Sequence, residues 1–182
     1  MEPSVTGYRT PARILHWTVA ILVLALVPVG LVMTGDGIAR GLQDTLFIAH
    51  KNLGTVVLVL MLARIAYRLT HRPPPLPAGL PPLQRRVAAA VHGVLYLVLA
   101  VMAVSGFVRV QAGGFPIELL DALGLPPLVP RSDAVAETAK RIHVLTHYPL
   151  IALIALHIAG AIHHAAVRRD GLIRRMWPPV AP

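Results

Sequence analysis

Histidines are the residues of this chain whose types and spacing could do chemistry. There are nine, and five of them fall between residues 141 and 169, in a stretch built mainly from Ile, Leu, Ala and Val. An imidazole is costly to bury in hydrocarbon, and ionisable side chains inside membrane segments usually serve a function. The absence of cysteine excludes disulfides, thiolate iron–sulfur clusters and the C-x-x-C-H attachment of c-type haem. We therefore expect any metal or cofactor to be held by histidines or carboxylates.

The histidines of the last apolar stretch form a stripe if that stretch is helical. An α-helix rises about 1.5 Å and turns about 100° per residue, so His157 lies about 21 Å along the axis from His143 and about 40° away around it. His164 continues the same stripe about 10 Å further on. His147 lies one turn from His143, whereas His163 is rotated about 100° away from His164.

Other apolar stretches supply a partner at each end of this stripe. His50 opens the second stretch at the level of His143, and His16 opens the first at the level of His157. Two cross-helix histidine pairs about 20 Å apart are what two bis-histidine haems inside a four-helix bundle require. By spacing alone, His147 could take the place of His143. A lone histidine would more simply be an interhelical hydrogen-bond partner, but four that pair by depth favour ligation.

The elements that must position these histidines are four membrane spans. Only 14% of the 182 residues are charged and 55% are hydrophobic, whereas soluble domains have about 25% charged residues. Four apolar stretches reach the roughly 20 residues that cross a bilayer, and they cover about 14–33, 47–69, 87–110 and 142–167. We predict an all-α fold, a transmembrane four-helix bundle forming a single membrane-embedded domain over residues 1–182. A short helix is predicted near "FPIELLDAL" in the loop over 111–140.

The basic residues predict the orientation of this bundle. The N-terminus, the end of the second span with the 70–86 loop, and the C-terminus share one face, which holds eleven of the 17 basic residues but only Glu2 and Asp170 as acids. The positive-inside rule then places both termini in the cytoplasm. The loops over 34–46 and 111–140 would be periplasmic in a bacterial inner membrane. The formal net charge of +9 thus reflects topology, and we expect no nucleic acid as a partner.

Several quoted segments resemble the bacterial cytochrome b561 family. These are "RILHW" in the first span, "IAHKNLGTVVLVLMLARIAYRL" in the second, "HGVLYLVLAVMAVSG" in the third, and "IH" followed 14 residues later by "LHIAGAIHH". The similarity covers nearly the whole chain except the 111–140 loop. It implies two haem b groups, with His16 and His157 on the inner one and His50 and His143 on the outer one. The resemblance thereby favours His143 over His147.

Some family members resemble superoxide oxidases, which pass electrons from periplasmic superoxide through both haems to ubiquinone. The resemblance implies a quinone site near the inner haem, formed here by His92 and His164, and the stripe also supports His164 over His163. An imidazole can donate a hydrogen bond to a quinone carbonyl and supply a proton. The simpler reading of His92 is an interfacial side chain in contact with headgroups.

Basic residues at the outer span ends have two readings. These residues are Lys51, Arg109, Lys140 and Arg141. They could pair with haem propionates or attract an anionic donor, but snorkelling to the interface explains any single one of them. Lys51 and Arg141 are the expected exceptions, because each adjoins a predicted ligand. Arg64 and Arg68, at the inner end of the second span, are expected to anchor the topology.

The sequence thus favours a superoxide:ubiquinone oxidoreductase of the bacterial inner membrane, with lipid, ubiquinone and superoxide as partners. One alternative is a cytochrome b anchor subunit that relays electrons between quinone and a dehydrogenase or hydrogenase. Another is a histidine-lined transporter for metal or protons, which would contain no haem.

Overall fold

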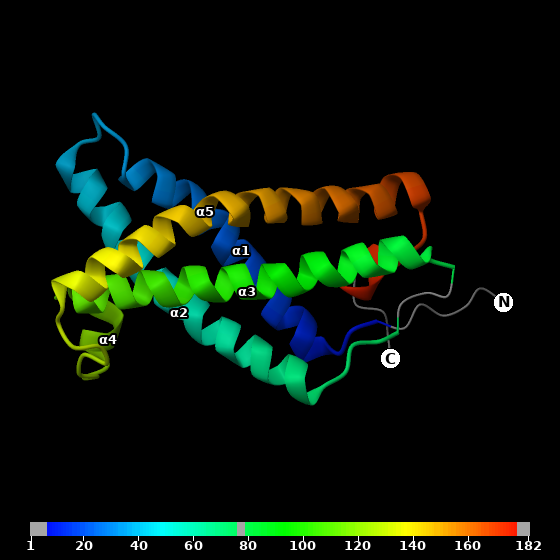
Figure 1. Ribbon diagram of the computed structural model, residues 1–182, viewed down its shortest axis with the longest axis horizontal. Helices are drawn as coiled ribbons and strands as arrows, with labels where there is room; N and C mark the ends of the chain where they lie inside the picture. The colour runs from blue at the N-terminus through cyan, green and yellow to red at the C-terminus, as the bar shows by residue number, and fades with distance from the viewer. Residues whose placement is uncertain (1–6, 76–78, 178–182) are drawn as a thin grey trace.

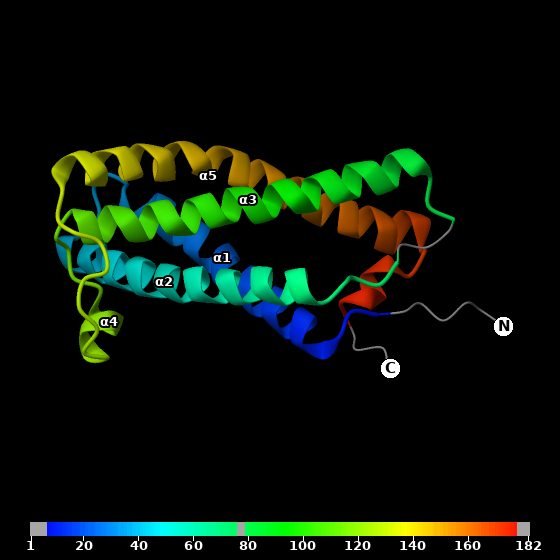
Figure 2. The same cartoon turned by 60° about the horizontal axis from the view of Figure 1, so that its bottom comes forward.

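Four long helices build the molecule, and in the view of Figure 1 two of them run along its length while the other two run obliquely to these (Figures 1 and 2). The computed structural model describes residues 7–75 and 79–177. The long helices are α1 (Thr10–Met33), α2 (Arg40–Thr70), α3 (Pro82–Ala112) and α5 (Asp133–Ile162). Each is long and apolar enough to cross a membrane. The predicted all-α bundle of four membrane helices is confirmed, whereas the side on which the termini lie stays a prediction.

All four helices begin earlier than the predicted spans. The apolar stretches predict starts near residues 14, 47, 87 and 142, but the helices begin at Thr10, Arg40, Pro82 and Asp133. A hydropathy pattern marks only the part of a helix that lies in hydrocarbon, and polar turns outside it carry no such signal. Local signals fix the true starts: a proline occupies the first turn of α3, and Ser132 caps α5 by accepting a hydrogen bond from the Val135 amide at 3.4 Å.

The helices pack mainly as two pairs. α1 runs against α2, α3 runs against α5, and α2 joins the pairs by contacting α3. The buried apolar cluster between α1 and α2 is small and consists of Val19, Val23, Leu26, Val57 and Met61. Many other large apolar side chains are exposed on the surface of the bundle. In a membrane these side chains face lipid, so the bundle does not need the large core of a soluble protein.

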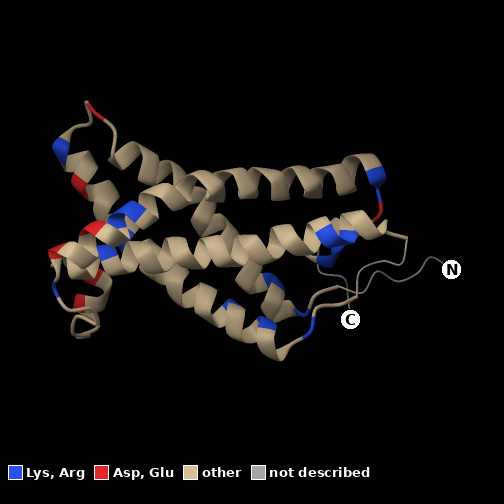
Figure 3. Ribbon diagram, viewed as in Figure 1, with Lys and Arg blue, Asp and Glu red and all other residues tan. Residues whose placement is uncertain are grey.

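Charged residues gather at the two ends of the bundle and leave its middle almost free of charge (Figure 3). The acidic residues concentrate at the end where α2 and α5 begin, together with the short helix α4 (Glu118–Ala122). The predicted short helix in the 111–140 loop is therefore confirmed. The opposite end, where α2 finishes and α3 begins, is the basic one and is called the inner end below. The end that carries α4 is called the outer end.

The chain changes its helical form at the inner end of α5. Residues His163–Arg168 form the π-helix η1, and Arg169 then takes a left-handed conformation with φ of 50°. This left-handed residue ends the helix and turns the chain back toward the bundle. The 3-10 helix η2 (Leu172–Arg175) follows. We predicted one regular helix to residue 167, and the structure corrects its last turns.

The segment after this turn ties three parts of the inner end together. Arg175 is buried, with 4% of its surface exposed, and its guanidinium donates to the carbonyls of Pro74 at 2.6 Å and Pro75 at 3.0 Å. The backbone carbonyl of Arg175 accepts from the Tyr8 amide at 3.0 Å. Trp17 in α1 donates from its indole to the Met176 carbonyl at 3.2 Å. We call this segment, Leu172–Arg175 with Met176, the C-terminal strap.

Candidate functional site

The inner end brings three imidazoles together from three helices. The rings of His16 on α1 and His157 on α5 have centroids 6.2 Å apart and planes at 79°. His92 on α3 lies on the same level, with its ring centroid 5.2 Å from that of His157. The structure therefore places the predicted inner pair side by side and adds His92 to it.

The outer end brings two imidazoles together. His50 on α2 and His143 on α5 have ring centroids 6.3 Å apart and planes at 88°. Nδ1 of His143 donates to the Met102 carbonyl at 2.9 Å and lies 3.4 Å from the Ser105 hydroxyl. Because a carbonyl oxygen only accepts, Nδ1 must carry the hydrogen, and Nε2 of His143 is left with its lone pair. This is the tautomer that a metal-binding imidazole needs.

The two pairs fit haem iron by their separation. Imidazole nitrogens bind metal ions of this kind at about 2 Å, so two imidazoles on opposite sides of one iron have ring centroids about 6 Å apart. Both pairs show this separation. Among the described residues, no three His, Asp or Glu side chains gather as ligands of a bare metal ion. Sites of two facing imidazoles suit a porphyrin, which supplies the other four ligands itself.

Glycines make room for the outer pair. A Cβ added to Gly106 would lie 2.8 Å from Cε1 of His143, and one added to Gly30 would lie 3.0 Å from Cε1 of His50. Nδ1 of His50 is buried and has no hydrogen-bond partner of normal geometry. A buried polar atom left in this state is typical of a site that a bound group completes.

His147 does not face His50. Its Nδ1 is bonded to the Val144 carbonyl one turn back, and its ring packs on Tyr148 with centroids 3.8 Å apart. Spacing alone left His143 and His147 as alternatives, and in the structure His143 is the one whose ring lies opposite that of His50.

Arg64 was missed as a site residue by sequence reasoning, which treated it as an anchor. Its guanidinium lies 2.8 Å from Nδ1 of His16 and over the Tyr96 ring at 4.9 Å. A guanidinium only donates, so Nδ1 of His16 accepts and Nε2 carries the hydrogen. For His16 to bind iron through Nε2, Arg64 has to release it. The signal was available: Arg64 follows His50 by 14 residues, the same interval that separates His143 from His157.

His164, a predicted quinone residue, is bonded to Asp170. Nδ1 of His164 lies 2.6 Å from Asp170 Oδ2, while Oδ1 accepts from the Leu172 amide at 3.2 Å. Arg168 lies 3.5 Å from the same carboxylate. Burial works to raise the pKa of Asp170, but the bond from His164, the Leu172 amide and Arg168 outweigh it and hold that pKa below its usual value. Spacing could not reveal this contact, because it needs the left-handed turn at Arg169.

The predicted quinone residues therefore have different partners. His92 contacts the ring of His157, and His164 contacts Asp170. Both residues lie at the inner end, His92 in the first third of α3 and His164 in η1.

A small polar cluster covers the outer end. Nζ of Lys51 lies 2.6 Å from Glu118 Oε1, and Asn52 donates to Glu118 Oε2 at 2.6 Å. The Asn52 carbonyl oxygen accepts from the Leu119 amide at 2.8 Å, so α4 is fastened to α2 directly beside His50. Burial works to raise the pKa of Glu118, but the hydrogen bonds from Lys51 and Asn52 outweigh it and keep that pKa below normal.

The structure distinguishes among the basic residues of the outer end. Lys51 is paired with Glu118, and Arg141 lies 3.3 Å from Glu137. Lys140 shares that carboxylate at 3.5 Å. Arg109, in the last turn of α3, instead lies close enough to both His50 and His143 to interact with them electrostatically. Sequence reasoning favoured Lys51 and Arg141, whereas the structure adds Arg109 as a cation that acts electrostatically on both rings of the outer pair.

Comparison with known proteins identifies relatives over almost the whole chain. A family model described as prokaryotic cytochrome b561 matches residues 7–179. The chain is 28% identical over 170 residues to Cytochrome b561 homolog 2 of Escherichia coli (strain K12), covering 93% of this chain and 90% of that protein. It is 25% identical over 166 residues to Cytochrome b561 homolog 1 of the same organism, covering 90% and 93%.

Proposed function

Because the chain belongs to the prokaryotic cytochrome b561 family, we propose that it passes electrons from superoxide outside the membrane to ubiquinone within it. Family membership makes it a multi-pass inner-membrane haem protein of transmembrane electron transfer. The donor, the acceptor, the cytoplasmic position of the termini and the residues below are our proposal.

The two histidine pairs carry this proposal. His16 with His157 would hold one haem b, and His50 with His143 would hold a second. A bound b haem supplies an iron that accepts and releases one electron. The protein's part is to hold the imidazoles in place: Met102 orients His143, and Gly30 and Gly106 leave room for the outer rings. The 14 residues between His143 and His157 set the two sites about 21 Å apart along α5.

The outer end suits an anionic donor. Arg109 places a positive charge beside His50 and His143, and Lys51, Lys140 and Arg141 lie at the same end. A local positive potential raises the concentration of a small anion and its rate of encounter. Superoxide carries one negative charge and gives up one electron to become dioxygen. Two such events match the two electrons that one quinone takes up.

The inner end suits the quinone. Reduction to quinol takes two electrons and two protons, so the site needs donors to the carbonyl oxygens and a route for protons. His92 and His164 are the proposed donors. Asp170 accepts the Nδ1 hydrogen bond of His164 and so fixes the ring with Nε2 toward the substrate. Nε2 donates to a quinone oxygen when the imidazole carries a hydrogen on both nitrogens, a form that the Asp170 carboxylate stabilises.

Stopped-flow absorption of the purified protein tests this function. The haems should become reduced in the absorption trace that follows mixing with superoxide, and added ubiquinone should then reoxidise them. Arg109→Gln should slow only the first step and reduce its dependence on ionic strength. Haems that stay oxidised under superoxide would exclude this donor, and a stable co-purifying dehydrogenase or hydrogenase subunit would favour the role of an anchor subunit instead.

A further inference from the structure

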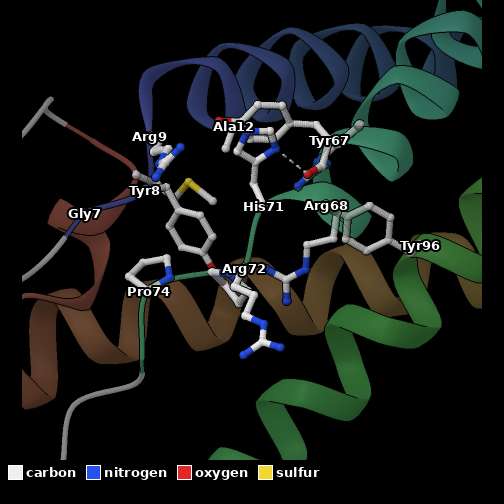
Figure 4. A pocket seen from close by; sticks show the side chains of 13 residues that line it. Gly7, Tyr8, Arg9, Ala12, Tyr67, Arg68, His71, Arg72, Pro74 and Tyr96 are labelled. Atoms are coloured by element: carbon white, nitrogen blue, oxygen red, sulfur yellow. Dashed lines mark hydrogen bonds between the residues drawn. The ribbon is translucent and has the colours of Figure 1, made fainter.

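A cavity of about 280 Å³ opens at the inner end between segments that are far apart in the sequence. Its walls come from the residues before α1, the end of α2, the loop after α2, α3 and the C-terminal strap (Figure 4). Its charged lining is entirely basic and consists of four arginines: Arg9, Arg64, Arg68 and Arg72. None of the residues that line it is acidic.

No carboxylate in the described ranges 7–75 and 79–177 forms an ion pair with these four arginines. The ion pairs of those ranges use Glu118, Glu137 and Asp170, and their basic partners are other residues. Four guanidinium groups around one small space repel each other, and the repulsion is stronger beside apolar helices than in bulk water. An anion in the cavity would remove that cost.

The lining has the donors that a phosphate group binds. A guanidinium presents its N–H groups as a planar fork that matches two oxygens of a phosphate, and tyrosine hydroxyls add single donors. Arg68 and Arg72 extend into the space that lies between Tyr8 and Tyr96 (Figure 4). The guanidinium of Arg175 lies over the Tyr8 ring, 5.6 Å from the ring centroid, and so helps to hold Tyr8 in place.

The position of the cavity favours a lipid as the source of the phosphate. It lies where the apolar part of α2 ends, and apolar residues close in the chain to its lining are exposed: Leu69, next to Arg68, is 82% exposed, and Ile14, two residues after Ala12, is 60% exposed. A phospholipid seated here would place its acyl chains against such side chains and its phosphate in the arginine cavity. Basic pockets between membrane helices bind anionic headgroups in this way.

We propose that this cavity is a binding site for the phosphate of an anionic phospholipid. The lining contains none of the four predicted haem ligands and neither proposed quinone residue, so the proposal stands whatever the electron donor and acceptor prove to be. Because Arg64 also contacts His16, an occupied site would sit directly beside the inner histidine pair.

Native mass spectrometry of the delipidated holoprotein in a neutral detergent tests the proposal. The probes are phosphatidylglycerol, phosphatidylcholine with the same acyl chains, and inorganic phosphate. The test variant is Arg68→Gln/Arg72→Gln. The control is Arg86→Gln/Arg174→Gln, which removes the same charge from exposed positions at the same end that do not line the cavity. An unchanged visible spectrum shows that each variant has folded.

We expect one phosphatidylglycerol to bind the wild type at least tenfold more tightly than phosphatidylcholine. Affinity should fall at least tenfold in the cavity variant and less than twofold in the control. Inorganic phosphate that binds equally well, with the same dependence on Arg68 and Arg72, would support the phosphate site but identify a soluble ion as its source. Equal losses in both variants, or equal binding of the two lipids, would overturn the proposal.

Discussion

The imidazole of His143 donates from Nδ1 to the backbone carbonyl of Met102, 2.9 Å away on the neighbouring helix α3. This bond fixes the tautomer and the orientation of the ring before any ligand binds. At the other end of the bundle, His16 accepts from Arg64 at 2.8 Å, which is the opposite tautomer. The outer histidine is thus already arranged for a metal, whereas the inner one depends on an arginine that has to move.

Replacing a histidine of one pair should remove one haem and leave the other. We expect His157→Ala to lower the haem content from two per chain to about one, because the inner iron loses an axial ligand while His50 and His143 are untouched. A pyridine haemochrome assay measures the stoichiometry. His147→Ala is the control and should keep both haems. Retention of two haems by His157→Ala would show that the pairing is wrong.

Gly106→Ala should disturb the outer site alone. The added Cβ would lie 2.8 Å from Cε1 of His143 and 3.0 Å from its Nδ1, so the ring has to shift away from Met102. Overpacking of this kind costs about 1–3 kcal/mol. We expect weaker haem retention and a change in the low-temperature α-band. Gly41→Ala, where a Cβ meets nothing within 4 Å, should have no such effect and serves as the control.

Arg64→Gln should lower the midpoint potential of the inner haem. Even after it releases Nδ1 of His16, the Arg64 guanidinium would leave a positive charge near the inner pair. That charge favours the reduced iron, which carries one positive charge less, so its loss should lower the potential by an amount on the order of tens of millivolts. Spectroscopic redox titration resolves the two centres. Arg13→Gln removes a charge at the same end without that contact. Equal shifts of both haems in Arg64→Gln would argue against a local effect.

Asp170→Asn should slow quinone reduction without affecting the donor reaction. An amide can still accept from His164 but brings no negative charge, so the ring is held less firmly and is less able to pass on a proton. We expect a drop of roughly tenfold or more in the rate with quinone and a flatter pH profile. Haem reduction by superoxide should be unchanged. Arg168→Gln, which leaves the bond between His164 and Asp170 in place, is the matched control.

The docking of α4 on α2 should weaken at low pH. The pKa of Glu118 is lower in the folded protein than in the unfolded chain, so its stabilising contribution is complete above the usual glutamate pKa of about 4.3. It is lost as the pH falls through the lower, folded value. Protection of the Leu119 amide, which donates to Asn52, should therefore fall as the pH drops below the usual glutamate value, when the exchange rate is compared with the intrinsic rate at the same pH. Glu118→Gln should exchange quickly at neutral pH, and a wild-type rate there would contradict the assignment.

Regular helix geometry controls which long-range neighbours of this protein could be predicted from its sequence. The intervals between His143, His157 and the partners His16 and His50 translate directly into depth and direction, because each lies within an uninterrupted helix. The same arithmetic would have identified Arg64, had it been applied to α2. The apolar runs located the four spans for the same reason.

The remaining contacts depend on turns that no periodicity describes. Asp170 reaches His164 only because the chain winds as a π-helix and then takes a left-handed residue at Arg169. Glu118 reaches Lys51 from a loop whose path depends on tertiary packing. The start of α5 at Asp133 follows from the Ser132 cap, a local signal weaker than the apolar run that begins several residues later.

The C-terminal strap has a consequence for biogenesis. Arg175 is synthesised after all four helices, yet it holds Pro74, Pro75 and Tyr8, which emerge from the ribosome much earlier. The inner end therefore stays open until the strap itself has been synthesised. During that interval the inner histidines would be accessible to a porphyrin, and closure of the strap afterwards would retain it.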